Sequence, residues 1–356
     1  FIAIHRPDRS PSQRFRFEQY LSFLKQNGWD YDFSNLISEK DDQFFYQKGY
    51  VLQKAFIFFK SIFIRISDVI KASKYDVVFI QREAFFTGST FFEKAFSRSK
   101  AKVVFDFDDS IWLPNVSEAN KKLEWLKNGH KTKEIIALSD LIIVGNQYLA
   151  AYAQEFNNNV VVIPTTIDLN YHKKMEVEVS DKITIGWTGT STTLGYLEEK
   201  LSVLGRLKSQ FKERIAFKII VEVDKTYDAI KTTTTQWNKE DEIKDLNGID
   251  IGIMPLPDNQ WTKGKCGFKG LQYMALGIPT IMSPVGVNSE IIIHGENGFL
   301  ADTDQEWFDL LSQLIESVQL RKELGVKGKK TIENRYSVES QKGIYLSELE
   351  KLILTK

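Results

Sequence analysis

Three lysines and two glycines lie close together in the segment Lys263–Lys269, which reads Lys-Gly-Lys-Cys-Gly-Phe-Lys. An apolar stretch, Ile249–Met254, precedes the segment, and a helical pattern that begins at Phe268 and stops at Gly277 follows it. A strand, a cationic glycine loop and a helix N-terminus in this order are typical of a phosphate site, because backbone N–H groups and the helix dipole point towards the anion. An ordinary strand–loop–helix unit with solvated lysines is the simpler alternative. The residues that we expect to bind phosphate are Lys263, Lys265, Gly267, Phe268 and Lys269.

The composition is that of a globular protein that buries a core. The chain has 356 residues, of which 42% are hydrophobic and 26% charged, and this length favours two domains. Lys+Arg and Asp+Glu both number 47, and this balance argues against a nucleic-acid partner. The single cysteine, Cys266, excludes a disulfide within the chain and indicates a reducing compartment. We find no signal peptide and no apolar run long enough to span a membrane, and we therefore expect a cytoplasmic protein.

Short apolar strands alternate with helical patterns along the whole chain, which predicts an α/β fold with parallel sheets. The expected strands are 1–5, 76–81, 102–107, 141–144, 160–163, 184–187, 217–221, 249–254 and 280–282. The expected helices are 13–26, 44–73, 120–138, 147–156, 194–209, 268–276, 305–317, 320–335 and 339–353. A polar stretch, residues 168–181, separates the two halves as a linker, and we expect His172 within it to be solvated. Two Rossmann-like domains follow, with ligands expected at the carboxyl ends of their strands.

One predicted helix is unusually apolar. Residues 51–70 are rich in Phe and Ile, with Lys54, Lys60 and Arg65 spaced through them. A surface that contacts a membrane or a lipid-linked acceptor would have this composition. A helix buried between a sheet and loops, with its basic side chains reaching outward, would have it too. We favour the buried helix, because so apolar a helix is usually packed on several sides.

Several segments resemble retaining glycosyltransferases of the GT-B fold, specifically family four (glycosyl transferases group 1) in its bacterial polysaccharide branch. The main likeness is in residues 250–299. Val-Ile-Pro-Thr-Thr-Ile-Asp at 162–168 resembles the family's hinge, and Gly-Trp-Thr-Gly-Thr at 186–190 the start of its C-terminal domain. Further segments that agree, in the family's order, are 11–16, 104–112, 142–149 and 294–300.

The resemblance implies two domains that face each other across a cleft. Residues 1–168 would form the acceptor-side domain and residues 169–336 the donor domain. The last helix, within 337–356, would cross back to the N-terminal domain.

The family's chemistry is the transfer of a sugar, with retention, from a nucleotide-sugar donor to a cell-surface glycan or its lipid-linked precursor. It needs no metal and no cofactor, since Lys265 and Lys269 would stabilise the departing diphosphate. Such an enzyme would work in the cytoplasm, with peripheral contact at the inner face of the cell membrane as a further expectation. The other residues implied at the donor are Gly189, Thr190, Gln272, Gly286, Glu290, Arg14 and Arg16.

Acidic residues gather after the strand 102–107, in the run Asp106-Phe107-Asp108-Asp109. Such a run chelates a metal in the other major glycosyltransferase fold. We instead expect Asp108 and Asp109 to orient the acceptor or to cap the loop, with Lys265 as the third catalytic residue. The residues expected on the acceptor side are His5, Arg82 and Glu83, and a surface ion pair between the last two is an equal alternative.

Two positions depart from the family. Its members commonly carry two glutamates with seven residues between them, whose positions in this chain would be Gly264 and Gln272. A glutamine can still accept hydrogen bonds from ribose, whereas a glycine cannot contact the sugar. A catalytically silent nucleotide-sugar-binding subunit and a sugar-nucleotide 2-epimerase of the same fold are therefore the competing hypotheses. The sequence leaves open the donor base, the sugar, the acceptor, the linkage and the oligomeric state.

Overall fold

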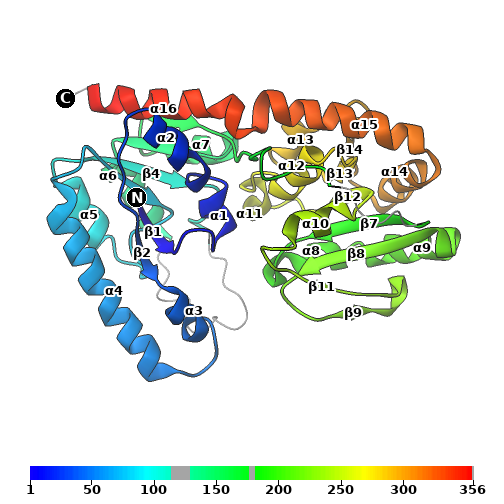
Figure 1. Cartoon of the computed structure of the whole chain (residues 1–356), viewed down its shortest axis with the longest axis horizontal. Coiled ribbons are helices and arrows are strands. Elements are labelled where there is room, and N and C mark those ends of the chain that lie inside the picture. Colours follow the sequence, from blue (N-terminus) through cyan, green and yellow to red (C-terminus); the bar gives the residue numbers. More distant parts are fainter. Residues whose placement is uncertain (114–128, 176–180, 355–356) are drawn as a thin grey trace. The chain divides into compact units, whose positions relative to one another are not determined.

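The computed structural model describes residues 1–113, 129–175 and 181–354. The chain divides into two compact units. Unit 1 contains Phe1–Thr165 and Lys342–Lys356, and unit 2 contains Thr166–Gln341. Each unit is built on a six-stranded sheet with helices packed around it (Figure 1). The predicted fold class, two Rossmann-like parallel-sheet units, is therefore confirmed.

The sheet of unit 1 has the strand order β2-β1-β3-β4-β5-β6, and all of its pairs are parallel. Its strands are β1 (Ile2–His5), β2 (Ser34–Ile37), β3 (Val77–Gln81), β4 (Lys102–Phe107), β5 (Leu141–Val144) and β6 (Val160–Val162). All four residues of β5 are buried, as expected of an apolar strand with helices on both faces. The strand order reverses between β1 and β3, and in open α/β sheets a ligand crevice lies at such a point.

The helices of unit 1 differ from the expected ones in two places. They are α1 (Pro11–Arg14), α2 (Leu21–Gln26), α3 (Glu39–Phe45), α4 (Val51–Ala72), α5 (Phe91–Ser97), α6 (His130–Leu138) and α7 (Gln147–Gln154). The single helix expected over 44–73 is broken before α4, because Gly49 and Tyr50 both have positive φ. The helix expected over 13–26 is interrupted between α1 and α2. Of the helix expected over 120–138, residues 120–128 lie outside the described residues.

The helix α4 is oriented opposite to our expectation. Its buried residues are Ile57, Ser61, Arg65 and Ala72, while most of its large apolar side chains are exposed. The prediction of a buried apolar helix whose basic side chains reach outward was therefore wrong, and Arg65 is among the residues that it buries. Among the described residues, no helix has both the length and the hydropathy needed to cross a membrane.

The sheet of unit 2 has the order β11-β8-β7-β12-β13-β14, again with parallel pairs throughout. Its strands are β7 (Ile183–Thr188), β8 (Ile215–Val221), β11 (Thr235–Gln236), β12 (Ile251–Met254), β13 (Thr280–Met282) and β14 (Phe299–Leu300). A small antiparallel hairpin is formed by β9 (Thr226–Tyr227) and β10 (Thr232–Thr233). The order reverses between β7 and β12, which is the switch point of a Rossmann sheet.

The helices of unit 2 agree with most of the expected ones. They are α8 (Leu194–Glu198), α9 (Leu201–Phe211), α10 (Glu242–Asn247), α11 (Gln260–Lys263), α12 (Phe268–Ala275), α13 (Asn288–Ile291), α14 (Asp304–Glu316) and α15 (Val318–Thr331). The last helix, α16 (Val338–Leu354), ends in unit 1, where Tyr345 stacks on Tyr20 with 4.4 Å between ring centroids.

Glycines let α12 lie close to the sheet of unit 2. A Cβ atom on Gly252 of β12 would come within 2.4 Å of the ring of Tyr273, and one on Gly270 of α12 would meet Met282 at 2.5 Å. The buried Tyr273 hydroxyl accepts a hydrogen bond from the backbone N–H of Thr188 at 2.8 Å. This bond and the close packing fix α12 against the carboxyl end of β7.

Candidate functional site

The predicted phosphate loop lies at the switch point of unit 2. It follows β12, and the Gly189 turn follows β7, the strand next to β12 in the sheet. Because both strands are parallel, their carboxyl ends meet at one edge of the sheet. The structure therefore brings these two segments to the same edge of one sheet.

A direct contact joins the two segments. Lys269, in the first turn of α12, places its Nζ 5.2 Å from the centroid of the Trp187 ring, and 3.5 Å from the Oγ1 of Thr193. Trp187 itself is buried in the core of unit 2. A lysine held over an aromatic face keeps its charge close to the protein while it can still meet an anion.

Of the other two lysines, Lys263 ends α11 and Lys265 lies in the loop between α11 and α12. Lys265 has its Nζ 5.6 Å from the ring centroid of Trp261 in α11, and Lys263 pairs with Asp258 at 3.2 Å. Both are half-buried. Cys266, directly after Lys265, is buried, in agreement with a packing role.

Two glycines shape the loop. Gly267 precedes α12 with a φ of +70°, and a Cβ atom there would come within 2.3 Å of Ile291. Gly286 has a φ of +55°, and its Cβ atom would lie 2.6 Å from the carbonyl oxygen of Lys263. The phosphate loop and the turn around Gly286 are thus packed backbone to backbone. The helix α12 starts at Phe268 without a side-chain cap and without an acidic residue in its first turn, which suits an anion at this end.

The Gly189 turn offers fewer backbone N–H donors to a phosphate than we expected. The N–H of Gly189 donates to the carbonyl of Ile220 at 3.0 Å, and the N–H of Thr190 donates to Thr193 Oγ1 at 3.2 Å. Both amides are therefore engaged, and the prediction that they supply donors to phosphate does not hold for this conformation. Thr190 is nevertheless exposed at the carboxyl end of β7, where its hydroxyl lies 2.8 Å from that of Thr192.

Gln272 and Glu290 occupy different surroundings. Gln272 is buried, and its amide nitrogen lies 3.2 Å from Nε2 of His172. His172 is buried as well, with its Nδ1 3.3 Å from the carbonyl oxygen of Asp168, so the expectation that it is solvated was wrong. Glu290 lies in α13 and is exposed.

Unit 1 gathers a second group of polar side chains at its own switch point. Arg82, directly after β3, donates to Asp108 at 2.8 Å and also pairs with Asp109. Asp108 accepts a further bond of 2.6 Å from the hydroxyl of Ser12, which in turn accepts one from Gln81. Arg82 has a φ of +60°, so its backbone is held in the left-handed region. The two carboxylates that we expected to orient an acceptor are thus bound and held in place by an arginine.

His5 ends β1 beside this group. Burial and the nearby guanidinium groups of Arg9, Arg82 and Arg6 lower the pKa of His5 from 6.5 to about 4. The imidazole is therefore neutral at pH 7, with its Nδ1 3.3 Å from the hydroxyl of Tyr46. A neutral ring can accept or donate one hydrogen bond here without adding charge.

The two arginines expected to reach donor phosphates are instead buried within unit 1. Arg16 donates to both oxygens of the buried Asp106, at 2.6 Å for the shortest contact, and to the carbonyl of Ile163. Arg14 is buried over the ring of Phe15, with its guanidinium carbon 4.9 Å from the ring centroid. Because Arg16 is satisfied by a buried carboxylate, the prediction that it binds the donor is wrong, and its function is to join the segment after β1 to β4.

Arg82 and Glu83 do not pair with each other. Glu83 accepts from Lys131 at 2.9 Å, and Lys131 is buried, also bonded to the carbonyl oxygens of Phe85 and Thr87. No local sequence pattern indicates that Lys131 or Ser12 belongs to this group, since they lie far along the chain from the residues that they contact.

Comparison with known proteins identifies one segment of unit 2. Residues 199–317 match the family model described as Glycosyl transferases group 1. The matched residues, about a third of the chain, include the phosphate loop, α12 and the Gly286 turn. No curated protein sequence matches the chain significantly.

Solved structures share the fold over most of the chain. Sucrose-phosphate synthase from Thermosynechococcus elongatus is 12% identical with a TM-score of 0.63, covering 84% of this chain and 79% of its own. A glycosyltransferase from Rickettsia africae ESF-5 is 13% identical with a TM-score of 0.62, covering 94% and 88%. HepE from Anabaena, solved with UDP and glucose, is 14% identical with a TM-score of 0.60, covering 81% of each chain. At these identities the likeness is one of fold.

Proposed function

We propose that this chain is a glycosyltransferase that moves a sugar, with retention, from a nucleotide-sugar donor to a cell-surface glycan or its lipid-linked precursor. The observation that carries the proposal is the phosphate loop at the switch point of unit 2, with Lys269 held over Trp187. The glycosyl transferases group 1 match over the same residues supports it. So does HepE, a protein of the same fold solved with UDP and glucose.

The proposed chemistry assigns charge stabilisation to the lysines. An acceptor hydroxyl oxygen forms a bond to the anomeric carbon on the face that the nucleotide leaves, the carbon–oxygen bond to the diphosphate breaks, and the hydroxyl proton passes to the departing phosphate. Lys265 and Lys269 stabilise the negative charge that grows on that phosphate. No metal or strong protein base is needed in this scheme. We propose the cytoplasm as its location, in keeping with the single free cysteine.

A silent nucleotide-sugar-binding subunit is the second candidate. It is favoured by Gly264 and Gln272, which stand where the resembling family carries glutamates. Gln272 is buried beside His172. A silent subunit would bind the donor and release no nucleotide.

A thermal-shift screen against nucleotides and nucleotide sugars tests binding, because a ligand that binds only the folded state raises Tm by mass action. We expect one nucleotide family to raise Tm, and Lys265→Ala to abolish that rise. Lys322→Ala, which removes an exposed lysine of α15, is the matched control and should keep it. Nucleotide release with an acceptor panel then separates transfer from silent binding. A rise that Lys265→Ala leaves unchanged would overturn the proposed site.

A further inference from the structure

The helix α4 presents a stripe of large apolar side chains to solvent. We refer to them as the α4 stripe: Leu52, Phe56, Phe59, Phe63, Ile66 and Ile70. Neighbours are four or three residues apart, so all six lie on one face of the helix. Leu52 is 84% exposed, Phe63 71% and Ile70 75%. Contiguous exposed apolar surface of this kind usually marks a binding surface in a protein that is otherwise well packed.

The opposite face of α4 fixes this orientation. Arg65 is fully buried and donates to the carbonyl oxygens of Ala3 and Ala84, both at 2.6 Å. It also pairs with Asp68 at 2.7 Å, and Asp68 accepts from the hydroxyl of Ser34. Rotating the helix to bury the stripe would break the bonds from Arg65 to the carbonyl oxygens of Ala3 and Ala84 and the bond from Ser34 to Asp68, all of which hold α4 to other elements of unit 1. The outward position of the stripe is therefore built into unit 1.

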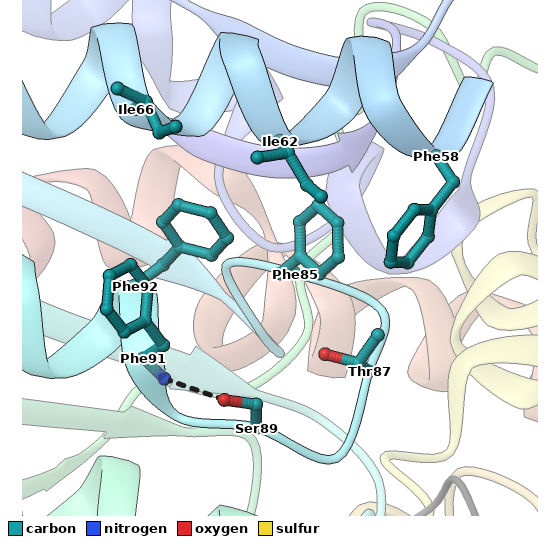
Figure 2. Close-up of a pocket in the computed structure, with 8 residues that line it drawn as sticks. All are labelled: Phe58, Ile62, Ile66, Phe85, Thr87, Ser89, Phe91 and Phe92. Atoms are coloured by element: carbon teal, nitrogen blue, oxygen red, sulfur yellow. Dashed lines mark hydrogen bonds between the residues drawn. The ribbon is translucent and has the colours of Figure 1, made fainter. Parts of the chain in front are cut away.

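An apolar pocket opens beside the stripe. Its volume is about 300 Å³, and Figure 2 shows side chains of α4 facing the ring of Phe85 and the start of α5. Ile66 belongs to both the stripe and the pocket, and the exposed ring of Phe91 stands at the pocket's edge. The residues that line it are Phe58, Ile62, Ile66, Phe85, Thr87, Ser89, Phe91 and Phe92. Stripe and pocket thus form one apolar surface, with a recess large enough for part of a hydrocarbon chain.

The charges of α4 indicate what covers this surface. The helix contains three lysines, of which Lys54 donates to the carbonyl oxygen of Gln47 and Lys60 pairs with Asp41. Its single carboxylate, Asp68, is the one that Arg65 and Ser34 bind. Lys71 is exposed near the end of the helix, and Lys74 directly after it is exposed too. The exposed positive charge beside the apolar residues of α4 therefore comes from Lys71 and Lys74.

We propose that the α4 stripe and the adjoining pocket dock on a lipid surface with anionic headgroups. The helix would lie in the plane of the interface, with its apolar side among the acyl chains and its lysines at the headgroups. A second copy of this chain fits less well, because pairing two such faces would bring lysines together, while the single carboxylate of α4, Asp68, is already bound by Arg65 and Ser34. The inference depends on unit 1 alone and does not rest on the proposed sugar transfer.

Vesicle flotation of the full chain tests the proposal. We expect binding to vesicles of phosphatidylcholine mixed with phosphatidylglycerol, and weaker binding to phosphatidylcholine alone or at high salt. The double variant Phe56→Ser/Phe63→Ser should lower the partition coefficient about tenfold or more. Val318→Ser/Val326→Ser removes two exposed apolar side chains from α15 and should bind like the wild type. Because all four positions are exposed, both variants should keep the wild-type circular dichroism and Tm.

A variant with one added tryptophan tests the pocket. In Phe91→Trp, the fluorescence of the added tryptophan is obtained by subtracting the wild-type emission spectrum. This emission should shift to shorter wavelength when vesicles are added, and lipids brominated on the acyl chain should quench it. Absence of both changes would remove the pocket from the docking surface.

Three results would overturn the proposal as a whole. The first is no flotation of the wild type with either vesicle, and the second is equal flotation of Phe56→Ser/Phe63→Ser. The third is a lipid-free wild type that is dimeric by light scattering while this variant is monomeric, since a second copy would then cover the stripe.

Discussion

Lys269 lies over the ring of Trp187, with its Nζ 5.2 Å from the ring centroid, and so connects the first turn of α12 to the strand β7. The two residues come from opposite sides of the switch point in the sheet of unit 2. Because Trp187 is buried, the ring is a fixed support and the ammonium group is held in place before any ligand arrives. Such a preorganised charge loses little conformational entropy when an anion binds.

Replacing Lys269 should therefore weaken phosphate binding. We expect Lys269→Ala to lower the affinity for the best-binding nucleoside diphosphate about tenfold or more, since charge-assisted hydrogen bonds contribute roughly 1.5–3 kcal/mol. Lys269→Arg, which keeps the charge, should lower this affinity less. Isothermal titration calorimetry measures both, with Lys322→Ala as the control. Equal affinities in the wild type and Lys269→Ala would exclude this lysine from the site.

Gly267 should resist substitution for two separable reasons. Its φ of +70° is unfavourable for alanine, and the new methyl group would lie 2.3 Å from Ile291 Cδ1. Gly295 has a similar φ of +76° but open space around it, so Gly295→Ala isolates the backbone cost of about 1 kcal/mol. We expect Gly267→Ala to lower the free energy of unfolding by about 1–3 kcal/mol more than that.

A double-mutant cycle tests the steric part. Ile291→Val removes the Cδ1 atom and should recover part of the loss in Gly267→Ala when unfolding is followed in denaturant. If Gly267→Ala and Gly295→Ala lower the free energy of unfolding by the same amount, the contact with Ile291 does not contribute to the loss.

Breaking the buried pair of Arg16 and Asp106 should lower the free energy of unfolding strongly. Arg16→Met leaves Asp106 buried without its cation, and we expect a loss of roughly 3–5 kcal/mol in the free energy of unfolding. Arg16→Met/Asp106→Leu should recover much of that loss. Lys182→Met is the control, because it breaks an exposed pair with Glu213 and should cause no measurable change. A stable Arg16→Met variant would contradict the structural role of this pair.

The sequence predicted the sheets better than the polar contacts. Strands such as β5 and β6 are continuous apolar runs that alternate with helical patterns. This local signal places Gly189 and Lys265 at one edge of the sheet once the strand order is known. The pairing of Arg16 with Asp106 joins residues that are 90 positions apart. No local pattern can reveal that contact, so an arginine after β1 looked available to a ligand.

The inverted helix α4 shows a different limit of sequence reasoning. Its periodicity indicates an amphipathic helix, but not which face is turned inward. Burying Arg65 becomes favourable only because Ala3, Ala84 and Asp68 provide acceptors around it, and these lie on other elements. The face of α4 that carries more apolar residues is exposed to solvent, whereas the more apolar face of a helix is usually buried.

His5 should make the stability of unit 1 depend on pH in the acid range. Its pKa is lowered from 6.5 to about 4 in the fold, by burial first and then by Arg9, Arg82 and Arg6, so the unfolded chain takes up the proton more readily. Its contribution is therefore fully present above pH 6.5 and is lost as pH falls from 6.5 to about 4, to a total of at most about 3 kcal/mol.

The slope of stability against pH isolates this contribution. In His5→Gln, the decline of the free energy of unfolding between pH 6.5 and about 4 should be shallower than in the wild type, because the group that protonates on unfolding is absent. His130→Gln, at an exposed histidine of the same unit, should keep the wild-type slope. Chemical denaturation at several pH values measures the three curves. Parallel curves for the wild type and His5→Gln would show that burial and the surrounding arginines do not hold this imidazole neutral in the fold.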